Sequence, residues 1–252
     1  MSLERVIAAA GRLVTHPRRE LANRRERYNV RRFLGRVAER GAAFDATWGT
    51  ETAVNVEAGE LEFPPQALKH SSQYSGTDEN VIRTLIEATG VPYEENAFVD
   101  VGSGKGKLVF ISATYPFELA IGVEYSHSLH EVALANLGKL PPSIRRAKEV
   151  RAVCADATSF ELPARPTVMT ICNPFSGPLM DAFFANVCRS LTGHPREMWV
   201  LYVNPVRRDL FDGSALFGTA LSAKRVCVYR HPADGTPIFA AALKERFDRW
   251  ER

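Results

Sequence analysis

Hydrophobic and polar residues follow two different periods from about residue 97 onward. Short apolar runs of strand length are separated by longer segments in which apolar residues recur every three or four positions. The first pattern is typical of buried strands, and the second of amphipathic helices. Their alternation with short links predicts a mostly parallel sheet covered by helices. We expect strands near residues 97–102, 119–125, 149–156, 166–173 and 197–204, and helices near residues 106–115, 127–139, 177–192 and 206–212.

Two further runs near the C-terminus have the composition of strands, residues 224–230 and residues 237–243. The turn-forming residues 231–235 separate them. So short a connection requires antiparallel pairing, because parallel neighbours need a crossover of about a dozen residues. With the five runs before them, they predict an α/β fold, a three-layer sandwich whose seven-strand, mostly parallel sheet ends in an antiparallel hairpin.

A helix is expected directly before the first strand. Thr77 and Asp78 are suited to begin it, and Gly90 is suited to end it. Ser128, three residues before Glu131, predicts a capping box at the start of a later helix. The apolar face of the helix after Asp78 would consist of Val81, Ile82, Leu85 and Ile86.

The composition of the first 76 residues divides the chain into three segments. Residues 1–40 hold eleven Arg and four Glu at helical spacing, and they predict a basic helical arm. The arm would either pack one face on the core or bind an anionic partner, such as nucleic acid, an acidic protein surface or a membrane. Residues 41–76 are rich in turn formers and predict a cap or lid, which leaves residues 77–252 as the main domain.

The composition of the whole chain is that of an ordinary soluble enzyme. Of its 252 residues 24% are charged, and the net charge of +3 is too small for a polycation that binds nucleic acid over its whole surface. No uncharged apolar stretch reaches the roughly 18 residues that span a bilayer. The four cysteines form no C-x-x-C pair, which favours buried thiols in a reducing compartment. We therefore expect a cytoplasmic protein.

Residues 98–110, FVDVGSGKGKLVF, carry the strongest functional signal. A strand containing Asp100 is followed by a turn with three glycines and then by a helical pattern, the arrangement that binds phosphates or nucleosides at the edge of a parallel sheet. Dinucleotide-binding turns have the spacing G-x-G-x-x-G, whereas here the third glycine comes one residue early and Lys107 stands in its place. Leu108 follows where a P-loop requires Ser or Thr, which excludes a P-loop.

Two carboxylates follow at the ends of the next two predicted strands. Glu124 lies 24 residues after Asp100, close to the spacing expected for an acidic residue that binds ribose hydroxyls. Asp156 could accept a hydrogen bond from an adenine amino group, while the N–H of Ala157 donates to the adjacent ring nitrogen. Alternatively, Glu124 is an exposed carboxylate at a strand end, and Asp156 is a helix N-cap or turn residue.

Asn173, Pro174 and Phe175 end the fourth predicted strand, at the crevice where open α/β sheets bind ligands. The Asn side chain and the carbonyl before proline offer acceptors to a substrate amine. Phe175 could form an aromatic wall beside a cation. The alternative is a simple Asn-Pro turn with a core phenylalanine.

Taken together, Asp100 with its glycine turn, Glu124, Asp156 and the Asn173–Phe175 turn resemble class I S-adenosylmethionine (SAM)-dependent methyltransferases, over about residues 74–245. The motif order, with YSGTDENV at residues 74–81 ahead of the first strand, resembles the seven-strand, non-SET histone-lysine methyltransferases. It also resembles prokaryotic proteins with an upstream Phe-Asp-x-x-x-Gly segment, here residues 44–49.

The resemblance implies SAM as the cofactor and a role for each matching residue. Glu124 would hold the ribose, and Asp156 with Ala157 the adenine. Asn173, Phe175 and Tyr74 would lie at the methyl-accepting side, with Trp48 a further lid candidate. The residues near the methionine part of the cofactor would be Tyr74, Thr77, Asp100, Gly102, Ser103 and Gly104.

The chain also departs from the histone enzymes, and this keeps the acceptor open. Gly76 stands where those enzymes have an acidic residue, and their turn after the fourth strand lacks the Asn-Pro-Phe form. Our leading hypothesis is methyl transfer to a nitrogen of lysine or another amine. The alternatives are an O- or N-methyltransferase of a small molecule, a noncatalytic interaction module that works through the arginine-rich arm and, more remotely, a nicotinamide enzyme. His127 and His130 lack further ligands nearby, so no metal is expected.

Overall fold

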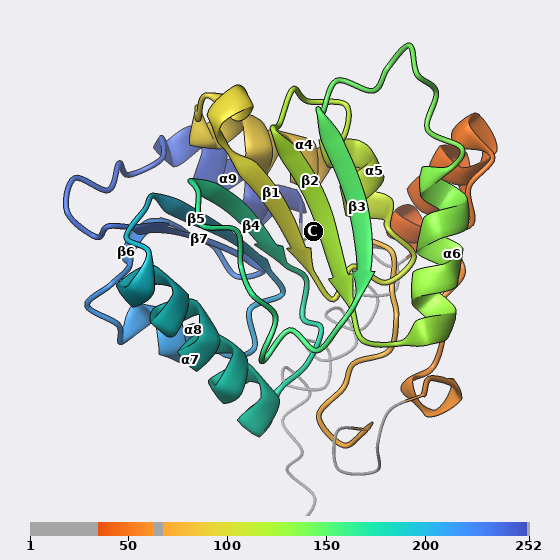
Figure 1. Cartoon of the computed structure of the whole chain (residues 1–252). Coiled ribbons are helices and arrows are strands. Elements are labelled where there is room, and N and C mark those ends of the chain that lie inside the picture. Colours follow the sequence, from red (N-terminus) through yellow and green to blue (C-terminus); the bar gives the residue numbers. More distant parts are fainter. Residues whose placement is uncertain (1–34, 63–67, 251–252) are drawn as a thin grey trace, which may run out of the picture.

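The structure is a computed structural model that describes residues 35–62 and 68–250. A twisted sheet lies between two layers of helices (Figure 1). Its strands are β1 (Ala97–Val101), β2 (Leu119–Glu124), β3 (Glu149–Cys154), β4 (Thr167–Ile171), β5 (Met198–Val203), β6 (Gly218–Ser222) and β7 (Val226–His231). The helices are α4 (Glu79–Thr89), α5 (Lys107–Ser112), α6 (His127–Leu137), α7 (Gly177–Gly193), α8 (Arg208–Asp212) and α9 (Ala241–Trp250), with 3-10 turns η1 (Ala58–Glu60) and η2 (Tyr93–Glu95).

The seven strands lie in the order β3-β2-β1-β4-β5-β7-β6. Strands β1 to β5 pair with one another in parallel, whereas β7 runs antiparallel to both of its neighbours, β5 and β6. The predicted three-layer α/β sandwich with a mostly parallel sheet and a terminal antiparallel hairpin is therefore confirmed.

Successive residues of β1 enter different halves of the core, because side chains alternate between the two faces of a strand. Phe98 packs with α4, α5 and α9 on one face, and Val99 and Val101 pack with α7 and α8 on the other. All five residues of β1 are buried, as expected for a central parallel strand.

The terminal hairpin uses different residues from those predicted. Strand β7 matches the first predicted run, but its hairpin partner is β6, which precedes it, and the expected strand at residues 237–243 is wrong. Instead, α9 begins at Ala241, because the Ala-rich sequence favours a helix and places Phe239, Leu243 and Phe247 four residues apart against the core.

Of two predicted helix starts, the one at α4 is confirmed and the one at α6 is wrong. Asp78 caps α4 by accepting a hydrogen bond from the N–H of Asn80, and Gly90 ends the helix in the left-handed conformation, both as predicted. The predicted buried face is also confirmed, and it consists of Val81, Ile82, Leu85 and Ile86. The capping box at Ser128 is wrong, because Ser126 caps α6 and Ser128 already lies within the helix.

Residues 1–34 lie outside the described part of the chain, so the arginine-rich arm and its anionic partner stay predictions. Residues 35–48 are helical, so helical structure continues past residue 40, the expected boundary between arm and cap. Among the helices of residues 35–62 and 68–250, none is both long enough and apolar enough to cross a membrane.

The Phe-Asp-x-x-x-Gly segment attaches the cap to the core. Phe44 packs edge-on against Phe110, with 5.4 Å between the ring centroids, and Gly49 ends the helix at a φ of +67°. Trp48 also contacts Phe110 in the core instead of covering the site as a lid.

Asp45 in this segment fixes the loop that follows. Its carboxylate accepts hydrogen bonds from the hydroxyls of Thr50 and Thr52 and from the N–H groups of Thr52 and Ala53, at 2.7–2.8 Å. Partial burial acts to raise the pKa of Asp45, but these hydrogen bonds outweigh it and hold the pKa below its ordinary value.

We predict that Asp45→Ala lowers the free energy of unfolding by about 2–3 kcal/mol at pH 7, because hydrogen bonds to an ionised group are lost. A lowered folded-state pKa stabilises the fold above the ordinary pKa of 3.8, so the difference should shrink as pH falls below that value. Urea unfolding at pH 7 and pH 3 measures it. The control Asp234→Ala removes an exposed carboxylate and should change stability by less than about 0.5 kcal/mol.

Candidate functional site

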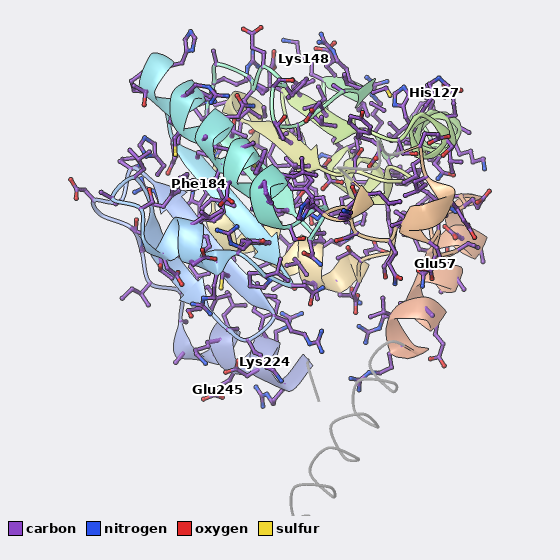
Figure 2. The ribbon with its side chains drawn as sticks, turned by 90° about the horizontal axis from the view of Figure 1, so that it is seen from below. Glu57, His127, Lys148, Phe184, Lys224 and Glu245 are labelled. Carbon is purple, nitrogen blue, oxygen red and sulfur yellow. The ribbon has the colours of Figure 1, made fainter. Side chains whose placement is uncertain are left out.

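A cavity of about 480 Å³ lies at the carboxyl ends of β1, β2 and β4. It is lined by residues from five segments that are distant in sequence, within 70–77, 100–108, 123–129, 155–158 and 172–179, and by Leu61. Figure 2 views the molecule from this end, with Phe184 of α7 and Glu57 of the cap on opposite sides. The position is the one at which open α/β sheets bind ligands, and the volume suits a nucleoside-sized molecule.

The glycine-rich turn after β1 forms the floor of the cavity. The backbone N–H groups of Gly102 and Ser103 both donate to the carbonyl of Val123, which holds the turn against β2. Gly102, Gly104 and Gly106 have φ values of +69°, +51° and +79°, a conformation that side chains disfavour. The three glycines are therefore required by the backbone path.

Close packing by the protein itself adds a second requirement for glycine. A Cβ at Gly102 would lie 2.3 Å from Cβ of Pro174, and one at Gly104 would lie 2.3 Å from the ring of Tyr74. The sequence predicted close approach of a ligand to this turn, and the structure shows close approach of two protein segments as well.

Glu124 at the end of β2 is buried and oriented by the backbone. Its two carboxylate oxygens accept hydrogen bonds from the N–H groups of Gly104 and Ser126, each at 2.8 Å. Burial raises the pKa of the carboxyl, and the backbone donors oppose this rise. Glu124 lines the cavity and is not an exposed strand-end carboxylate, since only 6% of it is exposed. Each oxygen keeps a further lone pair for a ligand donor.

Asp100 lies beside the glycine turn and is also buried. The hydroxyl of Thr170 donates to its Oδ1 at 2.6 Å. Burial raises the pKa of Asp100 to about 7, against the effect of the Thr170 hydrogen bond, and the negative charge of Glu124 adds to the rise. A ligand cation beside Asp100 would relieve this unfavourable ionisation.

Asp156 and Ala157 line the cavity on the side of β3. Asp156 is exposed, and its Oδ1 accepts hydrogen bonds from the N–H and the hydroxyl of Thr158 at 2.8 and 2.7 Å. This is the turn arrangement that we considered as the alternative. The other oxygen, Oδ2, makes no hydrogen bond within the described part of the chain, so both interpretations are compatible with the geometry.

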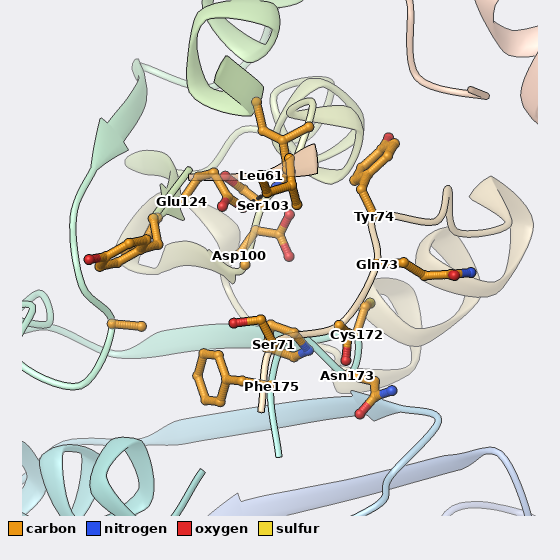
Figure 3. A pocket seen from close by; sticks show the side chains of 18 of the residues that line it. Leu61, Ser71, Gln73, Tyr74, Asp100, Ser103, Glu124, Cys172, Asn173 and Phe175 are labelled. Atoms are coloured by element: carbon orange, nitrogen blue, oxygen red, sulfur yellow. Dashed lines mark hydrogen bonds between the residues drawn. The ribbon is translucent and has the colours of Figure 1, made fainter. Parts of the chain in front are cut away.

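Tyr74 covers the glycine turn with its ring, while its hydroxyl donates to the carbonyl of Thr52 at 2.7 Å. Figure 3 shows this hydroxyl directed away from Asp100 and Asn173. Burial raises the pKa of Tyr74, with the charges of nearby carboxylates adding to the effect. Tyr74 is thus positioned as a neutral cover of the turn. Thr77, further along the same segment, also lines the cavity.

Asn173 is strained and incompletely bonded. Its φ of +54° is unusual for a residue other than glycine, and its Oδ1 is buried with no hydrogen-bond partner among residues 35–62 and 68–250. Figure 3 shows its side chain directed away from Glu124, toward the strands coloured blue. A buried acceptor of this kind is suited to a ligand N–H, because leaving it without a donor costs about 1–3 kcal/mol.

Phe175 occupies a different position from Asn173. It lines the same cavity, packs edge-on against Phe183 at 5.7 Å between centroids, and pairs through its backbone with Ser71. Pro174 accepts a hydrogen bond from the N–H of Ser72, so this turn and the segment before α4 hold each other in place.

A second cavity of about 330 Å³ adjoins the first and was not predicted. Thr77, Cys172 and Asn173 line both cavities, and Asn204 lines the second. Asn204 follows β5, has a φ of +51° and precedes a proline, as Asn173 does after β4. The repeated Asn-Pro at two adjacent strand ends is the sequence signal that could have identified it.

The sequence prediction gave no role to the two buried lysines of the turn, of which Lys107 borders a cavity and Lys105 does not. Lys105 forms an ion pair with Glu51 at 2.7 Å, and Lys107 lines the first cavity with its ammonium 4.9 Å from the ring centroid of Phe44. Burial lowers the pKa of Lys107, although nearby carboxylates oppose this. In the described part of the chain, no three His, Cys, Asp or Glu side chains gather as metal ligands.

Some solved methyltransferase structures are similar to this chain at low sequence identity. No family model and no curated protein matches the chain. Among solved structures, an RNA methyltransferase from Salinibacter ruber in complex with S-adenosyl-L-homocysteine is 18% identical, with 65% of this chain and 95% of that chain covered and a TM-score of 0.44. A ribosomal protein L11 methylase from Lactobacillus delbrueckii is 12% identical, over 60% of this chain and 75% of that one, with a TM-score of 0.41.

A 23S rRNA methyltransferase is 13% identical, over 69% of this chain and 75% of that one, with a TM-score of 0.42.

The strand order of the present sheet, with β7 reversed, is what decides the fold. The chain has the class I methyltransferase fold. The fold follows from this strand order, and at such identities and TM-scores the likeness to these proteins carries nothing about activity or acceptor.

We predict that Gly102→Ala lowers the free energy of unfolding by about 2–4 kcal/mol, because the new Cβ meets Pro174 and the backbone conformation disfavours a side chain. Gly193→Ala is the matched control, since its Cβ would meet nothing within 4 Å. The control should be neutral or stabilise by up to about 1 kcal/mol. Equal effects of the two substitutions in urea unfolding would contradict the packing described at the turn.

We predict that Asp100→Asn stabilises the unliganded protein at pH 8 but not at pH 4. The folded-state pKa of Asp100 is raised to about 7 from 3.8, so the wild-type protein loses stability as pH rises between these values. The variant does not lose this stability, because Asn does not ionise. The gain is at most about 4 kcal/mol, since one pKa unit corresponds to about 1.36 kcal/mol. Thermal unfolding at pH 4, 6 and 8 measures it, and a difference independent of pH would contradict it.

Proposed function

We propose that the chain is a SAM-dependent methyltransferase. The observation that carries the proposal is Glu124, a buried carboxylate beside the glycine-rich turn. It is held by hydrogen bonds from the N–H groups of Gly104 and Ser126. Such a group is suited to the two neighbouring hydroxyls of a ribose, and a phosphate in either position would be repelled. This favours an unphosphorylated nucleoside, as in SAM, over a nicotinamide dinucleotide phosphate.

The other residues of the larger cavity fit the remaining parts of SAM. Asp156 and the N–H of Ala157 would hold the adenine, and Gly102, Ser103 and Thr77 would border the methionine part, all of them lining the cavity. Asp100 would face a cationic group, which explains how a carboxylate with a raised pKa is tolerated there. SAM itself supplies an activated methyl group on a sulfonium.

The protein's part in such a reaction is positioning. Methyl transfer is an in-line displacement with a good leaving group, so the chain has to orient a neutral nucleophile, exclude water and bring the reacting atoms to about 3 Å. Tyr74, with its raised pKa and its bonded hydroxyl, serves as a wall and not as a base. Phe175 contributes an aromatic surface to the same cavity.

We further infer that the methylated atom is a nitrogen, in an amine. The buried Oδ1 of Asn173 has no hydrogen-bond partner within the part of the chain that the structure describes, and it would accept an N–H of the acceptor, which orients the nitrogen lone pair. A small-molecule O- or N-methyltransferase is the alternative enzyme, and a noncatalytic module working through the arginine-rich arm is the alternative of another class.

Calorimetric titration with S-adenosylhomocysteine tests the cofactor. We predict binding by the wild type and at least tenfold weaker binding by Glu124→Ala, because charge-assisted hydrogen bonds of about 1.5–3 kcal/mol would be lost. Glu131→Ala is the control, an exposed carboxylate on α6 that does not line the cavity. Absence of binding by the folded wild type would overturn both enzyme interpretations, and preferential binding of NADH would favour a dehydrogenase.

A further inference from the structure

Lys107, the first residue of α5, is a buried cation without a counterion. Only 4% of it is exposed, and it lines the larger cavity. Within residues 35–62 and 68–250 its ammonium makes neither an ion pair nor a hydrogen bond, and it lies over the ring of Phe44, 4.9 Å from the centroid. Such an ammonium is costly to the fold, because burial removes its water without supplying an anion.

Three carboxylates lie close enough to act on the charge of Lys107, but each is already bound by other groups. They are Asp45, Asp78 and Glu79. Asp78 pairs with Arg40. Glu79 pairs with Arg83 at 2.7 Å. Asp45 accepts hydrogen bonds from the loop of residues 50–53. The described part of the chain therefore leaves the ammonium of Lys107 for an anion from outside.

The neighbours of Lys107 identify the end of the larger cavity that would receive this anion. Asp78, whose charge acts on Lys107, directly follows Thr77, and Thr77 lines the cavity. Gly104, three residues before Lys107, lines it as well. Glu124 is not among the carboxylates that act on Lys107. The anion would thus lie toward Thr77 and away from the ribose proposed at Glu124.

We propose that Lys107 binds the α-carboxylate at the amino-acid end of the cofactor and makes the site selective for ligands that carry this group. The inference rests on the proposed methyltransferase function, which places the methionine part of SAM beside Thr77. The carboxylate is the anion that SAM brings. An ammonium has three N–H donors, so Lys107 can stay over Phe44 and still donate a charge-assisted hydrogen bond to the carboxylate.

Calorimetric titration with two matched ligands tests the charge. S-adenosylhomocysteine carries the carboxylate, and S-adenosyl-3-thiopropylamine is the same molecule without it. We expect the wild type to bind S-adenosylhomocysteine at least about tenfold more tightly, the effect of one hydrogen bond between charged groups. Lys107→Met should bind both ligands within about threefold of each other, whereas Lys107→Arg should retain part of the preference.

The stability of the unliganded protein separates ligand binding from a structural role of Lys107. Methionine keeps an apolar stem against Phe44 and removes the uncompensated charge, so the thermal midpoint of Lys107→Met should rise by about 2–4 °C. A lysine retained for the fold would give the opposite result, a lower midpoint after its substitution.

Two variants serve as controls. Lys105→Met removes a buried lysine of the same turn that borders neither cavity and pairs with Glu51 at 2.7 Å. It should lower the thermal midpoint and leave the preference between the two ligands as in the wild type. Glu124→Ala should weaken the binding of both ligands alike, because they share the ribose.

Equal binding of the two ligands by the wild type, or a preference that persists in Lys107→Met, would overturn the inference and leave the proposed function in place. A lowered thermal midpoint of unliganded Lys107→Met would overturn it in the same way. Absence of S-adenosylhomocysteine binding by the wild type would overturn the proposed function and this inference with it.

Discussion

The turn after β1 has no room for side chains, and this constraint organises the whole carboxyl end of the sheet. Pro174 lies against Gly102, and the ring of Tyr74 lies against Gly104. The same turn donates one N–H to Glu124, which also accepts from Ser126 at the start of α6. Four segments distant in sequence thus meet on a few backbone atoms, and the larger cavity is the space that their meeting leaves open.

The local pattern of the chain predicted most of the sheet and the buried face of α4, because strand and helix periods are properties of neighbouring residues. It failed at residues 237–243, where a short apolar run fits either structure and the spacing of Phe239 and Phe247 decided for packing against the core. Strand β6 was not predicted, because Gly218–Ser222 is short and about half of its residues are polar.

At the site, too, patterns of neighbouring residues could be predicted, whereas contacts between distant segments could not. Motif spacing identified Glu124, Asp100 and Asn173, and all three line the larger cavity. The sequence could not show the role of Asp45, because its hydrogen bonds reach a loop of no regular pattern. Nor could it show that Arg225 and Asn173 line one cavity, since 52 positions separate them and only the strand order places β5 between β4 and β7.

The hydrogen bond from Tyr74 to the carbonyl of Thr52 has a consequence for where the working unit of this protein begins. Asp45 fixes Thr52, Thr52 accepts from Tyr74, and Tyr74 covers Gly104. A fragment that starts at residue 77 would contain every strand of the sheet and would still lack one wall of its cavity. The unit that builds the larger cavity therefore extends back to the helix that contains Phe44, beyond the boundary that the sheet alone suggests.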